Sequence, residues 1–194
     1  MFTLEPIIER LLKSALFKAT KADPCNRHPC LTQLYSDGTG RLIASNGRVL
    51  VAVRNGCDWP LGLYKPPLGS DSREWLRDEA MEAEMAGKLQ GRVYPDWEAV
   101  VVPTGDHDLY TAQGWDYVTQ TRAVQAACVQ SGVNVDWCQW GRMLEALMGV
   151  KHDSTSIECF GPERAVVVKI TQTRLDVLAI IMPFQADLEK TCVK

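Results

Sequence analysis

The residues best suited to chemistry are a few cysteines and histidines. Cys25 and Cys30 flank His28, and thiolate and imidazole groups are ligands that zinc prefers. The C-x4-C spacing is loose, however, and no second Cys/His pair follows at zinc-like spacing. His107 and His152 each stand next to aspartate, a pattern more typical of solvated loops than of a general base. The sequence therefore predicts neither a metal site nor a catalytic residue.

Motifs whose spacing carries chemistry by itself are also missing from the sequence. It holds no phosphate-binding loop, no G-x-G-x-x-G, no G-x-S-x-G and no H-E-x-x-H. An enzyme stays an alternative without a nucleophile–base pair to support it, and we expect no cofactor. The seven cysteines are an odd, scattered set, which indicates reduced thiols in a cytoplasm.

The amino-acid composition excludes several further classes of protein. The chain has 194 residues, 46% of them hydrophobic and 23% charged, with a net charge of -3. These values are those of an ordinary globular protein, and they exclude a disordered tail, a collagen-like rod and a strongly basic nucleic-acid coat. The N-terminus lacks the features of a signal peptide, and no apolar run reaches the roughly 18 residues of a membrane helix. The length suits one domain or two small ones.

A helix is the first element expected to position functional residues. Apolar side chains recur with helical spacing at Leu4, Ile7, Ile8, Leu11, Leu12, Ala15 and Leu16. Thr3 is the expected N-cap, and Pro6 is tolerated in the first turn. We expect the helix to end before Asp23-Pro24, because a residue that precedes proline disfavours helical geometry.

Three extended runs follow this helix and form a meander. They are predicted at 30–35, 41–45 and 49–53, and the last is rich in β-branched residues. Ser36–Gly40 is a hairpin-type turn, and Asn46-Gly47 is a second tight-turn signal because positive φ costs little there. Residues 1–55 are thus a helix followed by three strands.

The same unit is predicted again near the C-terminus. After a short strand at 133–135, a helix is expected over 137–148 and strands over 154–160, 165–170 and 177–182. A duplicated supersecondary unit indicates an α+β fold of helix plus antiparallel three-strand units.

The segment between the two units is interpreted as an insertion. Residues 57–69 are expected to be a loop, 70–88 a charged helix and 120–130 a shorter helix, with Tyr94-Pro95-Asp96-Trp97 between the helices. We therefore predict a single domain over 1–194, with a first half at 1–55, an insertion at 56–131 and a second half at 132–194.

Three stretches resemble one family, the bacterial β sliding clamp, the beta subunit of DNA polymerase III. The stretch 26–32 with 41–50 is similar to the family's R-P-x-L-x-G strand and its L-x-A-T-D-G-H-R-L turn. The stretch 91–103 is similar to G-R-F-P-D-Y-x-x-V-L-P, and 179–184 to the terminal Y-V-V-M-P-M. The segment 133–147 also resembles the strand and helix that open the second half of a clamp domain.

The sequence also departs from the family pattern. Its turn is Ser-Asn-Gly-Arg-Val where the family favours Thr-Asp-Gly-His-Arg, and ten residues follow Phe184. A family subunit has three such domains, whereas this chain has two half-domain patterns. It resembles the first half of the family's middle domain joined to the second half of its last domain.

The resemblance implies a hydrophobic pocket for short peptides, because these stretches converge on one in the family. The implied partners are replication or repair proteins carrying a clamp-binding peptide, and the implied role is binding without catalysis. A small apolar groove with a flexible methionine and rigid prolines suits a peptide bearing leucine or phenylalanine. The implied pocket residues are Ser45, Gly47, Arg48, Leu50, Pro95, Val100, Ile180, Ile181, Met182, Pro183 and Phe184.

The resemblance also implies that the chain could contact double-stranded DNA without reading its sequence. Helices of the family present Lys and Arg to phosphates, and such backbone contacts do not read bases. The corresponding residues here are Arg10, Lys13, Lys18, Lys21 and Arg142, a weak footprint that is more typical of a solvated helix face.

Two further alternatives stay open. One is a homo-oligomeric ring acting as a sliding clamp or processivity factor, for which about six copies would have to close head to tail. The other is an unrelated α+β structural domain, in which Ile180, Ile181 and Met182 are an ordinary core strand.

Overall fold

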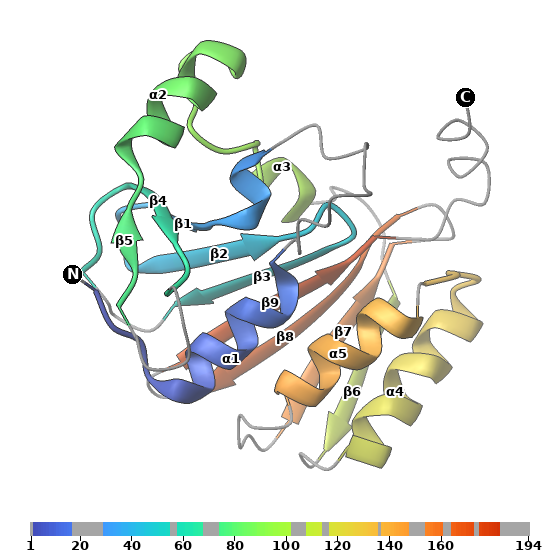
Figure 1. The fold of residues 1–194 in the computed structure, drawn as a ribbon. Coiled ribbons are helices and arrows are strands. Elements are labelled where there is room, and N and C mark those ends of the chain that lie inside the picture. The colour runs from blue at the N-terminus through green and yellow to red at the C-terminus, as the bar shows by residue number, and fades with distance from the viewer. Residues whose placement is uncertain are drawn as a thin grey trace.

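In the computed structural model, the described part of the chain forms a single nine-stranded sheet with helices packed on it (Figure 1). The structure describes residues 2–16, 29–54, 58–67, 74–101, 108–113, 117–135, 137–147, 154–160, 164–172 and 175–182. The strand order is β5-β4-β1-β2-β3-β9-β8-β7-β6, and every neighbouring pair is antiparallel.

The helices and strands have the following bounds. The helices are α1 (Pro6–Ala15), the 3-10 helix η1 (Pro29–Thr32), α2 (Glu79–Lys88), α3 (Glu98–Val101), α4 (Tyr117–Gln130) and α5 (Trp137–Leu147). The strands are β1 (Leu34–Ser36), β2 (Arg41–Ser45), β3 (Val49–Arg54), β4 (Gly62–Lys65), β5 (Leu76–Arg77), β6 (Asp108–Gln113), β7 (Ser154–Cys159), β8 (Val166–Gln172) and β9 (Leu175–Ile181).

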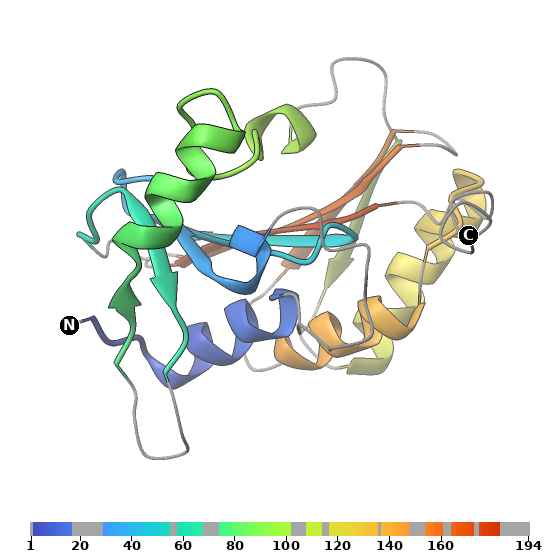
Figure 2. The same ribbon diagram turned by 45° about the horizontal axis from the view of Figure 1, so that its top comes forward.

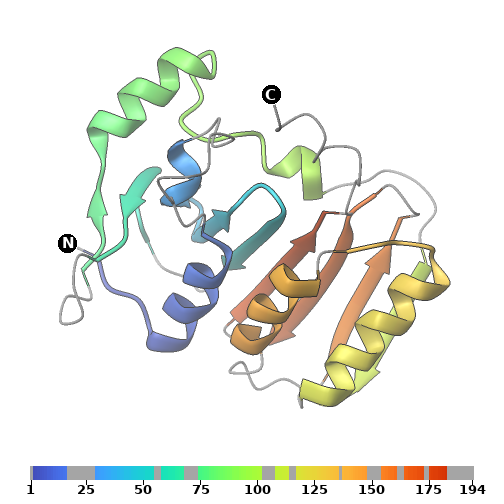
Figure 3. The same cartoon turned by 45° about the vertical axis from the view of Figure 1, so that its right-hand side comes forward.

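The predicted duplication of helix plus three strands is present. The unit α1 with β1, β2 and β3 is repeated as α5 with β7, β8 and β9. The last strands of the two units, β3 and β9, pair with each other, so the strands of the two units run in mirrored order, β1-β2-β3 and β9-β8-β7, on either side of the junction. Figure 3 shows α5 and α4 in front of the strands of the second unit, and α1 below the strands of the first.

Two apolar cores lie on opposite faces of the sheet (Figure 2). The helix-side core lies under α1, α4 and α5 and includes Leu11, Trp140, Val51 and Ala179. The outer core lies on the other face, and its buried residues are Cys30, Ile43, Leu50, Ala52, Leu63, Met85, Tyr94, Trp97, Ala165, Val167 and Ile180. The alternation of side chains along each strand supplies both cores at once.

Helix α1 packs as its apolar stripe predicts, since Ile8, Leu11, Leu12 and Ala15 are all buried. Its start differs from the prediction. Glu5 rather than Thr3 occupies the N-cap position, no side chain caps the helix, and Pro6 provides the helical φ at its first turn. The described helix ends at Ala15, and the expected stop at Asp23-Pro24 lies outside the described residues.

The Asn46-Gly47 turn is confirmed, and its hydrogen bonds explain why. Gly47 has a φ of 83°, which costs a glycine nothing. The Asn46 side chain accepts hydrogen bonds from the backbone N–H groups of Arg48 and Val49, each at 2.9 Å. The Ser45 hydroxyl donates to the Val49 carbonyl at 2.9 Å, so β2 and β3 are held in register.

The middle segment forms more of the sheet than the sequence pattern indicates. The expected loop over 57–69 contains β4, and the expected helix from residue 70 begins at Glu79. Trp75 instead bridges to Phe2, and β5 pairs with β4, because burial of the indole outweighs local helix propensity. The Asp78 side chain then caps α2 by accepting from the Met81 N–H at 3.2 Å.

Other boundaries differ by smaller amounts. The extended run expected at 30–35 begins as η1 and becomes a strand only at Leu34. Helix α4 begins at Tyr117 rather than at residue 120. In the part of the chain that the structure describes, we find no helix long and apolar enough to span a membrane.

Candidate functional site

The junction between β3 and β9 brings together two of the three stretches that the sequence singles out. Leu50 stands opposite Ile180, and Val49 stands opposite Ile181. Immediately past the strand end, the Met182 N–H donates to the Arg48 carbonyl at 2.8 Å. About 130 residues separate the two segments in the sequence, so only strand pairing makes them neighbours.

The candidate residues at this junction divide between the two faces of the sheet. Leu50 and Ile180 belong to the outer core, whereas Ile181 belongs to the helix-side core and is 1% exposed. The Ile181 side chain therefore does not contribute to the surface that Leu50 and Ile180 underlie. Strand alternation dictates this split, because adjacent residues of one strand face opposite ways.

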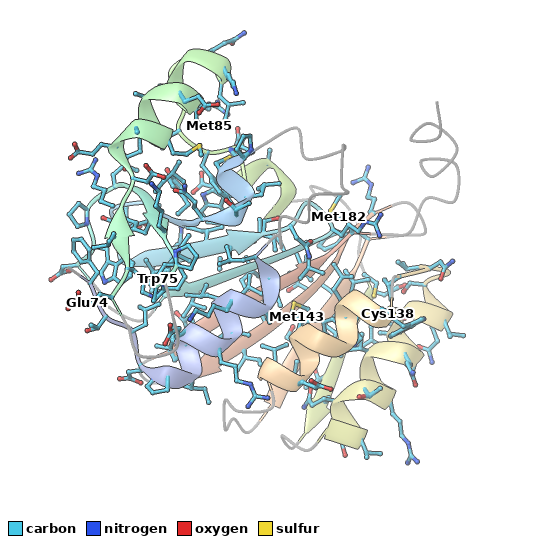
Figure 4. The ribbon with its side chains drawn as sticks, viewed as in Figure 1. Glu74, Trp75, Met85, Cys138, Met143 and Met182 are labelled. Carbon is cyan, nitrogen blue, oxygen red and sulfur yellow. The ribbon has the colours of Figure 1, made fainter. Side chains whose placement is uncertain are left out.

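Exposure also differs strongly among the candidates. Ser45 is buried with its hydroxyl bonded to backbone, while Gly47 and Arg48 are exposed and Pro95 is half-buried. Met182, labelled at the end of β9 in Figure 4, is 39% exposed. Val100 lies in α3, although its side chain is outside the described part, as are Pro183 and Phe184.

The third stretch lies against the same face. The rings of Tyr35 and Tyr94 stack with centroids 4.8 Å apart and an interplanar angle of 2°, and Trp97 is 9% exposed in the outer core. Burial of its hydroxyl raises the pKa of Tyr94 well above the usual range, so this group is neutral. An ion pair of 2.7 Å between Arg92 and Asp96 closes the turn that carries Pro95.

A cavity that the sequence patterns did not reveal lies further along the same strands. Its volume is about 490 Å³, and its lining residues are Arg41, Ala52, Arg54, Trp97, Glu98, Lys169, Ile170, Asp176, Val177 and Leu178. The sequence did hold one indication of this cavity. Leu50, Ala52 and Arg54 occupy every second position of β3, so their side chains lie on one face of the sheet. Which residues of β8 and β9 complete the cavity follows only from the strand register.

The basic residues proposed for DNA are only partly described. Arg10 and Lys13 lie exposed on α1, which packs beside α5, the helix that contains Arg142. Lys13 forms an ion pair of 2.6 Å with Glu9, and its ammonium lies 5.9 Å from the Trp75 ring centroid. Lys18, Lys21 and the Arg142 side chain lie outside the described residues.

The cysteines and histidines show the following environment. Burial raises the pKa of the Cys30 thiol to about 11 and that of Cys128 to about 12, so both stay protonated at neutral pH and are poor nucleophiles. Among the residues with described positions, no group of three or more His, Cys, Asp and Glu is arranged to hold a metal ion. Cys25, His28, His107 and His152 lie outside these residues.

No protein-family model and no curated protein sequence matches the chain. Solved structures do match it. The Helicobacter pylori beta clamp, in a complex with diflunisal, superposes with a TM-score of 0.50 at 9% identity, over 94% of this chain and 65% of that chain. The Bacillus subtilis DNA polymerase sliding clamp gives 0.50 at 11% identity, over 93% of this chain and 62% of that chain.

These matches establish a sliding-clamp fold for the chain, as the three sequence stretches and the duplicated unit predict. The chain spans less than two thirds of the length of either clamp.

Proposed function

We propose that the chain is a clamp-like binding protein of DNA replication or repair, which docks short peptides on its outer face at the β3–β9 junction and has no catalytic activity. The observation that carries this proposal is the register of the junction. It places Leu50, Ile180 and the exposed Met182 beside the Asn46-Gly47 turn.

The chemistry of this junction supports an apolar peptide anchor. Leu50 and Ile180 supply a rigid apolar floor within the outer core, while Met182 is unbranched and adapts to the shape of a ligand. Arg48 and the turn form a polar rim, which suits orientation of a peptide backbone. The partners in this proposal are replication or repair proteins that carry a short peptide with a leucine or phenylalanine anchor.

The proposal also covers the domain organisation of the chain and the cellular compartment in which it acts. We take 1–194 as a single clamp-like domain, with halves at 1–55 and 132–194 around the segment 56–131. Buried free thiols at Cys30, Cys128 and Cys159 fit a reducing compartment, as in a cytoplasm. Contact of α1 with double-stranded DNA through Arg10 and Lys13 is a secondary part of the proposal.

A binding assay with one exposed residue changed tests the docking surface. Fluorescence anisotropy of a labelled decapeptide with a Leu-Phe anchor should show saturable binding to the wild-type chain. Met182→Asp should weaken this binding at least tenfold, because a carboxylate replaces an apolar contact. Val129→Asp is the matched control, since Val129 is 79% exposed on α4, on the other face of the sheet. Equal binding by the wild type and Met182→Asp would reject the surface.

A homo-oligomeric ring is the second candidate, and the end of the sheet favours it. Within the described residues, β6 has a strand partner on one side only, so six residues of backbone are available for pairing with another copy. Analytical ultracentrifugation across a hundredfold range of concentration tests the ring. A monomer at every concentration would exclude it without affecting the docking proposal.

A further inference from the structure

The cavity of about 490 Å³ on the outer face continues the surface proposed for docking. Leu50, Ala52 and Arg54 follow one another at every second position of β3, and Ile180, Leu178 and Asp176 do so on β9. All six therefore face the outer side. At about 3.4 Å per residue, the four steps along the strand from Leu50 to Arg54 span roughly 14 Å.

Two arginines face each other at the far end of this cavity. Arg41 on β2 is the direct register partner of Arg54 on β3, and both line the cavity. Like charges directly opposite on neighbouring strands destabilise a sheet. Asp176, which stands opposite Arg54 on β9, and Glu98, 3.9 Å from Arg41, offset part of this repulsion, and an anion held between the two guanidinium groups would offset more of it.

The hydrogen-bonding donors of these arginines are largely unused. The Arg41 Nη1 atom lies 4.0 Å from Asp37 and 3.9 Å from Glu98, which is beyond hydrogen-bonding distance in both cases. Arg54 has no ion pair within the described ranges of the chain. Lys169 differs from both, because its ammonium is already bonded to Glu158 at 2.6 Å.

Trp97 gives the arginine pair a defined geometry. The Arg41 guanidinium lies 5.8 Å from the centroid of the Trp97 ring, within the range of a cation–π contact. The indole is 9% exposed and belongs to the outer core, so the wall that supports Arg41 is rigid. This contact uses none of the N–H donors of the guanidinium, so they stay available to an acceptor.

We propose that this cavity binds the carboxylate of an acidic side chain, about four residues from the apolar anchor of the docked peptide. The inference rests on the proposed function and specifies its ligand. A single carboxylate fits better than a polyanion, because Glu98 and Asp176 also line the cavity and would repel nucleic acid. The volume lies within the range of small-ligand sites.

Nuclear magnetic resonance of the full chain separates this inference from the docking proposal. The probes are C-terminally amidated peptides with a Leu-Phe anchor and one glutamate four residues before or after it. We expect one of them to shift both the Met182 methyl signal and the Arg41 and Arg54 Nε–H signals. A peptide with the glutamate adjacent to the anchor should shift Met182 alone, because its carboxylate falls short of the arginines.

The other outcomes separate the carboxylate site from the docking surface. If Met182 responds to every peptide and the arginines to none, the carboxylate site is rejected and the docking surface stands. If the arginines respond to the glutamate peptides while Met182 does not, docking at the junction is rejected, and with it the inference, which needs a peptide anchored there. If neither signal moves, both are rejected.

Affinities with matched variants measure the strength of the effect. The glutamate peptide should bind the wild-type chain about tenfold more tightly than its glutamine counterpart. Arg54→Gln should abolish this preference while leaving the affinity for the glutamine peptide unchanged. Arg122→Gln, on the exposed side of α4, should retain the preference. A short DNA duplex that displaces the glutamate peptide at equimolar concentration would assign the arginine pair to phosphate and overturn the inference.

Discussion

The sheet has two halves, a first made of β5-β4-β1-β2-β3 and a second made of β9-β8-β7-β6, each with the segments that pack on it. They share one unit but are covered on different faces. In the first half, η1, α2 and the segment 94–97 cover the outer face and bury residues such as Leu63 and Met85. In the second half, α4 instead adds a second helix to the helix side, and β6 exposes Leu109 at 62%. The candidate site lies at β3 and β9, where the two halves of the sheet join.

The two halves therefore share a repeated helix-plus-strands unit without exposing the same surface. The helix-side core must be continuous, because α1 and α5 pack against each other across the junction. The outer face is free to differ, since a strand can face water on one side. Ligand surfaces are therefore expected on the outer face. Substitutions in the two halves of the sheet should have correspondingly different effects.

The largest effect is expected in the shared helix-side core. Trp75 in the first half is fully buried and Trp140 in the second is 1% exposed. Replacing either by alanine should lower the free energy of unfolding by about 3–5 kcal/mol, because each leaves a large cavity. Denaturant unfolding followed by circular dichroism should show a single shifted transition in both variants. Two separate transitions would show that the halves are independent.

The outer layer of the first half should matter next. Met85→Ala removes a fully buried side chain between α2 and the sheet and should cost about 2–4 kcal/mol. Leu109→Ala, on the exposed outer face of the second half, should change stability by less than about 0.5 kcal/mol. Equal costs in denaturant unfolding would contradict the asymmetry of the two outer faces.

A smaller effect is expected where β4 meets α2. Gly62 has a φ of 154°, and a Cβ there would lie 2.3 Å from the Glu82 carboxylate. That carboxylate accepts from the Leu63 N–H at 2.9 Å and pairs with Arg77 at 2.9 Å. Gly62→Ala should therefore cost about 1–3 kcal/mol, measured by the thermal midpoint. Gly87→Ala on α2 is the control, because nothing lies within 4 Å of its Cβ, and it should not lower the midpoint.

The smallest effect is a pH dependence confined to the first half. Burial raises the pKa of Asp78, but hydrogen bonds from Lys65, Gln33 and the Met81 N–H outweigh it, so the pKa is lowered overall. A carboxyl with a lowered pKa in the folded state stabilises the protein above its unfolded pKa, which is about 3.9. This contribution is lost as the pH falls through the folded value.

Stability should accordingly decrease below about pH 4 in the wild type. Asp78→Asn should be less stable near neutral pH by about 1 kcal/mol, because it weakens the N-cap of α2, and its acid dependence should be shallower. Unfolding midpoints between pH 3 and pH 7 measure both. An identical acid dependence in the two proteins would show that Asp78 does not carry it.

Local patterns predicted the repeated part of the fold well. The apolar stripe of α1, the Asn46-Gly47 turn and the strands β2, β3, β7, β8 and β9 all follow from spacing that acts over a few residues. The same reasoning failed for β4 and β5, because Trp75 is drawn into a bridge with Phe2 by burial, which a local window does not contain.

The candidate site divides in the same way. Spacing and resemblance pointed to Leu50, Ile180 and Met182, whose neighbourhood the strand register then defined. The division of Ile180 and Ile181 between two faces follows from alternation and could have been predicted once β9 was recognised. The pairing of Arg41 with Arg54 also follows once the Asn46-Gly47 turn sets the register of β2 against β3. The contact of Trp97 with Arg41 does not, because it joins segments far apart in the sequence.

The sequence by itself determined the elements of the repeated units and their apolar faces, because helix and strand periods are local properties of the chain. Only the tertiary structure decided that β3 lies beside β9, that the Trp97 ring supports Arg41, and that a cavity opens beside Asp176. These contacts join segments far apart in the sequence, and their free energy depends on burial and register, which no short window of residues contains.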